Sequence, residues 1–118
     1  MKKLKFISAC CLLFFSCGKD RLNVPQGVLK ADTLSQIQAE FYLIEAANNL
    51  VLINHDTTKA SYDQYYEAVL KKHNTTKAQI DSSLNFYAQY PDELDSIFSK
   101  TLLLLEKQQL NYQANTHE

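Results

Sequence analysis

The sequence predicts an all-α fold, a small bundle of about four helices. Only two of the 118 residues are glycine and two are proline, and after Gly27 the chain has no glycine and one proline, Pro91. This stretch is rich in leucine, alanine, glutamine, lysine and glutamate, which all favour helices. Its apolar residues recur every three or four positions, and no useful length alternates as a strand would.

An N-terminal targeting segment precedes the bundle. Three of residues 1–5 are lysines, and residues 6–15 form an apolar run that only Ser8 interrupts. A membrane-spanning helix needs about 20 apolar residues, whereas charged residues follow this run almost at once. We therefore interpret residues 1–16 as a cleaved signal peptide.

Cys17 is the predicted site of lipid attachment. Small Ser16 before it resembles the lipoprotein signal-peptidase site, where the cysteine thiol receives a diacylglycerol and the chain is cut before it. Residues 7–9 make Cys10 a stricter match to the same pattern, but cleavage there would leave almost no apolar run. Cys17 is therefore preferred, and Cys10 stays open as the alternative.

Residues 17–30 are predicted to be an extended, lipidated tether, because both glycines and one proline of the chain cluster there. Two or more acyl chains hold a protein stably on a bilayer. The expected location is the cell envelope, on the outer membrane facing the periplasm. Lys19-Asp20 resembles a surface-export signal of Bacteroidetes lipoproteins, although Arg21 stands where that signal has a second acidic residue. Display on the cell surface is the alternative.

Cysteine content and net charge limit the functions open to the 102 residues that remain after cleavage of the signal peptide. All three cysteines, Cys10, Cys11 and Cys17, lie in the signal peptide or at its end, so we expect no disulfide or thiol chemistry in the mature fold. Cleavage removes three of the 12 basic residues and none of the 13 acidic ones, which leaves a net charge of −4. Without a basic stripe, nucleic acid is not an expected partner.

The helical domain is predicted over residues 31–113, and its first helix over 33–53. Asp32 is the expected N-cap, with Ser35 as the alternative. Glu40 and Glu45 are five residues apart and point to different faces, so we interpret both as solvated. The buried stripe of this helix recurs at three- and four-residue spacing and comprises Leu34, Ile37, Phe41, Ile44 and Val51. It is widened by Ala39, Leu43, Ala47 and Leu50.

The second helix is predicted over residues 59–73, with basic residues in its last turn, where the helix dipole favours cations. Tyrosines gather on its inner stripe. Such a cluster is more often core, with hydroxyls reaching the surface, than a ligand site. The expected stripe comprises Tyr62, Tyr65, Tyr66, Val69 and Leu70.

The third helix is predicted over residues 77–89. Thr76 and Gln79 form a Thr-x-x-Gln capping box, a fairly specific signal for a helix N-terminus. Ile80, Leu84 and Tyr87 are its expected buried positions, while Ser82 and Ser83 are small or exposed ones.

The fourth helix is predicted over residues 91–112, because proline suits the first position of a helix. A polar, frayed tail is expected over residues 114–118. Leu103 and Leu104 leave apolar surface on other sides of this helix. Its expected inward positions are Leu94, Ile97, Phe98, Leu102, Leu105 and Tyr112.

An ordered set of helix caps and core positions runs from about residue 25 to residue 105. Its most recognisable parts are segments 65–74, 80–84, 86–87, 90–91 and 94–98, preceded by Val24-Pro25 and Asp32-Thr33-Leu34. This order resembles the domain-of-unknown-function family 4296, small predicted lipoproteins of Bacteroidetes. The resemblance implies a lipoprotein with a short helical domain. It implies no activity, because the family has no assigned catalytic residues.

Catalysis is not expected from this inventory. The chain has no glycine-rich phosphate loop, and His55, His73 and His117 are scattered without the spacing of metal ligands. We therefore expect no enzyme activity, no cofactor, no metal and no small-molecule substrate.

The leading functional hypothesis is a lipid-anchored interaction module that binds another protein of the cell envelope. The alternative is a chaperone-like periplasmic holder of unfolded envelope proteins. That alternative rests on a weaker similarity of residues 66–94 to the peptide-holding helices of periplasmic folding factors. The candidate partner-contact residues are Tyr62, Tyr65, Tyr66, Tyr87, Leu103 and Leu104.

Overall fold

The computed structural model describes residues 22–53 and 59–116, and within them it is built of four α-helices. These are α1 (Ala31–Ile53), α2 (Lys59–Lys72), α3 (Lys77–Tyr87) and α4 (Pro91–Thr116). These residues contain no strand, so the all-α prediction is confirmed. The predicted signal peptide, Cys17 and its alternative Cys10 lie outside the described residues.

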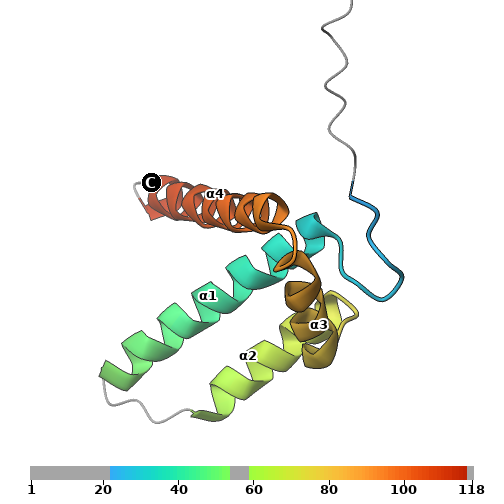
Figure 1. Ribbon diagram of the computed structural model, residues 1–118. Coiled ribbons are helices and arrows are strands. Elements are labelled where there is room, and N and C mark those ends of the chain that lie inside the picture. The colour runs from blue at the N-terminus through green and yellow to red at the C-terminus, as the bar shows by residue number, and fades with distance from the viewer. Residues whose placement is uncertain (1–21, 54–58, 117–118) are drawn as a thin grey trace, which may run out of the picture.

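The helices are arranged around α1 (Figure 1). α2 returns alongside α1 in the opposite direction, and α3 leads from α2 into α4. α4 packs across the N-terminal part of α1. None of the helices in the described part of the chain is long and apolar enough to cross a lipid bilayer.

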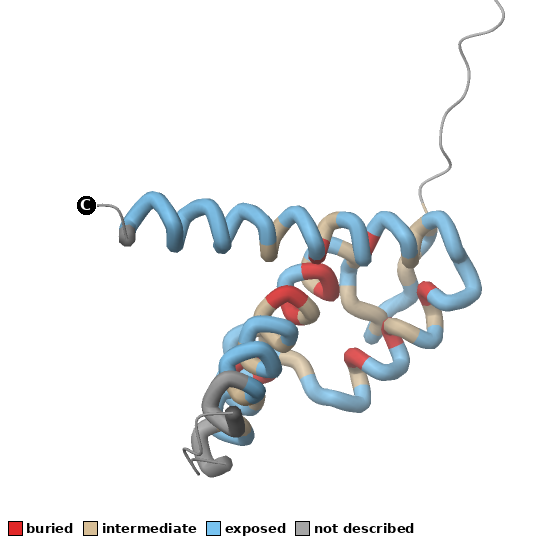
Figure 2. Tube along the Cα trace, turned by 90° about the vertical axis from the view of Figure 1, so that its left-hand side faces the viewer, coloured by how far each residue is buried: buried red, intermediate tan, exposed pale blue. Residues whose placement is uncertain are grey.

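The hydrophobic core lies where the helices meet, and every helix contributes to it. Figure 2 shows the buried positions gathered at this junction, while the C-terminal half of α4 is exposed. At the edge of the core, the rings of Phe41 and Tyr66 stack with their centroids 4.3 Å apart. The buried apolar side chains of this cluster are Leu34, Ile37, Val69, Leu70, Ile80, Tyr87 and Ile97.

The start of α1 differs from the prediction. The helix begins at Ala31, and the carbonyl of Lys30 accepts the first helical hydrogen bond, so neither Asp32 nor Ser35 is the N-cap. Ser35 is instead fully buried, and its hydroxyl lies 3.2 Å from the carbonyl oxygen of Ile97 in α4. A small residue at this point lets the two helices approach closely.

Polar side chains also hold the crossing of α1 and α4. The buried hydroxyl of Thr101 lies 2.9 Å from the carbonyl oxygen of Ile97 in its own helix and, across the crossing, 3.2 Å from Oε1 of Gln38 in α1. On the surface nearby, Asp32 forms an ion pair with Lys100. Every buried side-chain nitrogen or oxygen among the described residues has a hydrogen-bond partner, so no side-chain polar atom is buried unpaired at the crossing.

The segment 22–30 is packed against the helices and is not the extended tether that we predicted. Its turn is made by Gly27, whose φ of +90° is the left-handed value that glycine adopts without strain. The N–H of Val28 donates to the carbonyl of Pro25 at 3.2 Å, as in a type II turn. The ordered domain therefore begins no later than Leu22, whereas residue 31 was expected.

α3 fastens this segment through side-chain hydrogen bonds. The N–H of Leu29 donates to the hydroxyl of Ser83 at 2.9 Å, and the hydroxyl of Tyr87 donates to the carbonyl of Leu29 at 2.9 Å. The side-chain Nε2 of Gln79 donates to the carbonyl of Gly27 at 3.1 Å. Burial raises the pKa of the Tyr87 phenol above its ordinary value of 10.0, which favours the protonated form that donates this hydrogen bond.

The connection between α2 and α3 follows from two local motifs. Asn74 has a positive φ of 47°, and the N–H of Thr75 donates back to the carbonyl of Leu70 at 3.0 Å, which is the Schellman pattern. The hydroxyl of Thr76 then accepts from the N–H of Gln79 at 3.2 Å, so the predicted N-cap is confirmed.

α4 begins at Pro91, as predicted, but continues to Thr116, through positions expected to be a frayed tail. Within it only Ile97 and Thr101 are fully buried. Its 26 residues span about 39 Å, whereas the 11 residues of α3 span about 16 Å. The C-terminal half of α4 therefore extends past the elements that cover its first half.

Three inward predictions on α4 are wrong. Phe98 is 40% exposed, Leu102 66% and Tyr112 72%. Tyr65 of α2, which was also expected in the buried stripe, is 61% exposed. Phe98 and Leu102 each follow a buried residue, Ile97 and Thr101, and are therefore turned by about 100° around the helix from it, whereas Tyr112 lies on the exposed C-terminal half of α4.

Glu40 joins α1 to the end of α2 and is not the solvated residue that we expected. Its carboxylate lies 2.9 Å from Nζ of Lys72 and 3.0 Å from Nε2 of His73. Partial burial opposes ionisation of Glu40, but the hydrogen bonds from His73 and Lys72 outweigh it, so its pKa lies below the ordinary 4.5. Its charged form therefore stabilises the packing of α1 on α2.

Glu40→Gln is expected to lower the free energy of unfolding at pH 7 by about 1 kcal/mol. Because the folded pKa of Glu40 is depressed, its contribution is complete above pH 4.5 and is lost as the pH falls below that value. Urea unfolding should therefore separate the variant from the wild type at pH 7 and bring them together at about pH 3. Glu45→Gln, on the exposed side of α1, is the control. An equal deficit at both pH values would contradict the assignment.

Candidate interaction surface

The predicted tyrosine contacts do not form one surface. Tyr87 is 1% exposed and belongs to the core, so its prediction as a partner contact is wrong. Tyr66 is half-buried against Phe41, and Tyr62 lies beside it with ring centroids 6.5 Å apart. Only Tyr65 presents most of its side chain to solvent.

The two predicted leucine contacts on α4 behave differently from each other. Leu103 is 64% exposed, whereas Leu104 is half-buried toward the body of the protein. A further leucine, Leu110, lies seven residues, or about two helical turns, after Leu103 and is 60% exposed. The exposed apolar surface therefore centres on the C-terminal half of α4, away from the tyrosines of α2.

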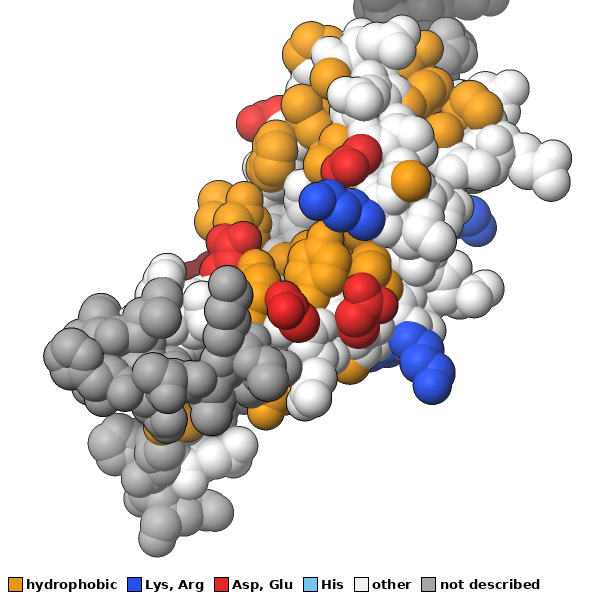
Figure 3. Space-filling model, turned by 90° about the horizontal axis from the view of Figure 1, so that it is seen from below, with side chains coloured by type: hydrophobic (Ala, Val, Ile, Leu, Met, Phe, Trp, Pro, Cys, Tyr) orange, Lys and Arg blue, Asp and Glu red, His pale blue; other side chains and the backbone are white. Residues whose placement is uncertain are grey.

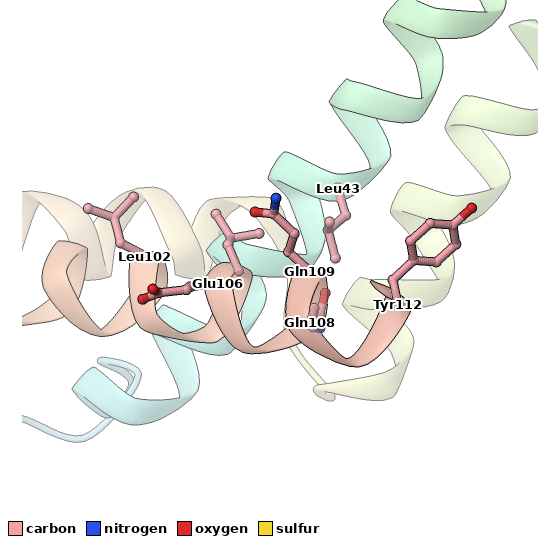
Figure 4. A pocket seen from close by; sticks show the side chains of 7 residues that line it. Leu43, Leu102, Glu106, Gln108, Gln109 and Tyr112 are labelled. Carbon is pink, nitrogen blue, oxygen red and sulfur yellow. The ribbon is translucent and has the colours of Figure 1, made fainter. Parts of the chain in front are cut away.

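A groove of about 770 Å³ opens between α1 and this half of α4. Figure 4 shows Leu43 on α1 opposite Gln109 and Tyr112 on α4. The groove is open along its solvent side and mainly apolar. From α4 it is lined by Leu102, Leu105, Glu106, Gln108, Gln109 and Tyr112.

A smaller hollow of about 310 Å³ lies between α1 and α2. It shares Leu43 with the larger groove, so the two hollows are adjacent on α1. Figure 3 shows the molecule from below, with hydrophobic side chains gathered on this face and charged groups among them. From α1 and α2 the hollow is also lined by Glu40, Ile44, Tyr65, Ala68, Val69 and Lys72.

The apolar residues that line the groove were predicted from the sequence to face the core. Leu43 widened the predicted stripe of α1, and Leu105 and Tyr112 were expected to face inward. No local pattern marks these residues, because α1 is nearly as long as α4 and the uncovered stretch of α4 is set by where the two helices cross.

The groove offers chemistry suited to recognition. Leucine and tyrosine side chains give apolar contact, and the amides of Gln108 and Gln109 offer donors and acceptors that can orient a ligand. Glu106 adds one carboxylate at the margin. Among the described residues, no group of three or more histidine, cysteine, aspartate or glutamate side chains could hold a metal ion.

Comparison with known proteins identifies the family. No curated protein and no solved structure matches the chain. A family model described as a domain of unknown function, DUF4296, matches residues 25–111. The match includes the segment fastened by α3, the α1–α4 crossing and almost all of the groove, ending one residue before Tyr112. The chain belongs to the DUF4296 family of domains of unknown function.

Proposed function

We propose that the protein is a lipid-anchored component of the cell envelope that binds another envelope protein and catalyses no reaction. The anchor is the thiol of Cys17, and its support is the signal-like sequence that ends there. The binding surface is the groove between α1 and α4, which supports recognition because its apolar lining is open to solvent.

The groove carries this proposal. Two helices diverge around Leu43, leaving an apolar trough with glutamine amides along one side. An amphipathic helix of the partner fits such a trough, with its apolar stripe against Leu105 and Tyr112. Glu106 at the margin favours a basic residue beside that stripe.

The test is capture of the partner by the full chain, carrying a C-terminal tag and purified with detergent from membranes after cross-linking in cells. One protein should be recovered in a fixed ratio to the bait. Leu43→Asp places a charge in the groove and should reduce this recovery about tenfold or more. Tyr42→Asp is the matched control, because Tyr42 is the neighbouring residue of α1, is 48% exposed and lies outside the groove lining.

The outcomes separate the functions. A mixture of unfolded outer-membrane proteins, without a fixed ratio, would favour the chaperone-like holder. Equal recovery with both variants would rule out the groove as the binding surface. The same membranes test the anchor, because a labelled fatty acid should mark the wild-type chain and Cys10→Ala but not Cys17→Ala. Labelling of Cys17→Ala would move the lipid to Cys10.

A further inference from the structure

α4 has a second apolar stripe on the side that faces away from the body of the protein. Leu103 follows buried Thr101 by two residues, which turns it by about 200° to the opposite side of the helix. Leu110 lies on the same side, seven residues further on. Both leucines are more than half exposed, and neither lines the groove toward α1.

The residues around these leucines make the stripe self-complementary. Exposed Ser99 and Ala114 lie at its two ends, and exposed Glu106 and Lys107 lie at its centre. In an antiparallel pair of α4 helices centred between Glu106 and Lys107, each Leu103 meets Leu110 of the second copy. The small end residues then meet each other, which lets the helices approach along the whole stripe.

The central charges favour the antiparallel arrangement. Glu106 and Lys107 form no ion pair with any residue in the described part of the chain. Across a two-fold axis, Glu106 of each copy faces Lys107 of the other, so the pair contains two reciprocal attractions. A parallel pair in register would instead bring Glu106 against Glu106 and Lys107 against Lys107.

The fold leaves room for this contact. Figure 2 shows the C-terminal half of α4 standing clear of the other helices. The stripe from Ser99 to Ala114 is about 22 Å long, enough for four turns of each helix to pair. The stripe and the groove lie on different sides of α4 but meet at Glu106, which lines the margin of the groove and stands at the centre of the stripe, so a second copy and a partner in the groove would share this carboxylate.

We infer that two copies of the chain associate through an antiparallel, two-fold symmetric contact between their α4 helices. Leu103 and Leu110 supply the apolar contact, and Glu106 and Lys107 set its direction and register. A contact of this size makes a weak pair that forms and dissociates readily.

Disulfide cross-linking tests the register with the full chain in membranes. Two differently tagged copies are co-expressed, one with Leu103→Cys and one with Leu110→Cys, and oxidised with a copper catalyst. The mixed pair should be linked, and mass spectrometry should find the peptides containing positions 103 and 110 joined. Copies that all carry Leu103→Cys should link at least about fivefold less, because these positions lie about 10 Å apart along the antiparallel helices. Chains with native cysteines only give the background.

A charge exchange tests the pairing of Glu106 with Lys107 on the same cysteine-bearing chains. Glu106→Lys in both copies should lower the linkage about tenfold, because symmetry makes each reversal act twice. Glu106→Lys in one copy and Lys107→Glu in the other should restore it, which a misfolded variant could not do. The inference is overturned if the mixed cysteine pair is linked no better than the single-position pair, or if the exchanged charges do not restore linkage.

Discussion

Replacing Tyr87 with alanine is expected to lower the free energy of unfolding by about 3–5 kcal/mol. Tyr87 is 1% exposed and lies in the core, and its hydroxyl holds the carbonyl of Leu29 at 2.9 Å. The substitution leaves a cavity in the core and also removes one of the hydrogen bonds that hold the segment 22–30 against α3. Urea unfolding of the full chain, followed by circular dichroism, measures the loss.

Two variants separate the causes of this effect. Tyr87→Phe keeps the ring and removes the hydrogen bond to Leu29, so it should cost about 0.5–1.5 kcal/mol. Tyr65→Ala removes a ring that is mostly exposed and should change stability by less than about 0.5 kcal/mol. If Tyr87→Ala were no more destabilising than Tyr65→Ala, the placement of Tyr87 in the core would be wrong.

Replacing Ile97 with alanine is expected to lower the free energy of unfolding by about 2–5 kcal/mol. Ile97 is 1% exposed and is the residue of α4 that enters the core. Its backbone carbonyl also lies against the buried hydroxyl of Ser35, so the site sits at the crossing with α1 and has little freedom to collapse.

The neighbouring residue provides the matched comparison for Ile97. Phe98 is larger but 40% exposed, so Phe98→Ala should cost clearly less than Ile97→Ala. Thermal unfolding followed by circular dichroism compares the two variants directly. The reverse order would mean that α4 is rotated about its axis relative to the structure described here.

The helices could be predicted because their signals are local. The cap at Thr76 and the start of α4 at Pro91 depend on a few neighbouring residues, whose side-chain and backbone geometry acts within one turn. The same holds for the end of α2, where Asn74 adopts the left-handed conformation. These features require no knowledge of how the helices pack.

Contacts between distant segments could not be predicted in the same way. Ser35 resembled a helix cap, but its burial depends on α4, which is 62 residues away in sequence. Leu29 resembled part of a tether, but Ser83 and Tyr87 of α3 satisfy both of its backbone groups. The sequence does not reveal whether a hydroxyl or an amide forms its hydrogen bond with water or with the backbone of a distant segment.

The candidate site was predicted only in outline. Exposed apolar surface was expected on the fourth helix, and Leu103 provides it. The groove depends on where α1 and α4 diverge, which is set by Ser35 and Thr101 at their crossing. Periodicity alone assigns Leu105 and Tyr112 to the inner side of α4 but cannot say where its neighbour ends.

The fastening of residues 22–30 by α3 also governs the order of events during synthesis. Leu29 emerges from the ribosome before Ser83, and 54 residues separate the two partners. The segment 22–30 therefore gains these partners only after the third helix has been made. Closing so long a loop is slow compared with forming a helix. Completion of the fold must consequently follow translation of the third helix, whichever route the nascent chain takes.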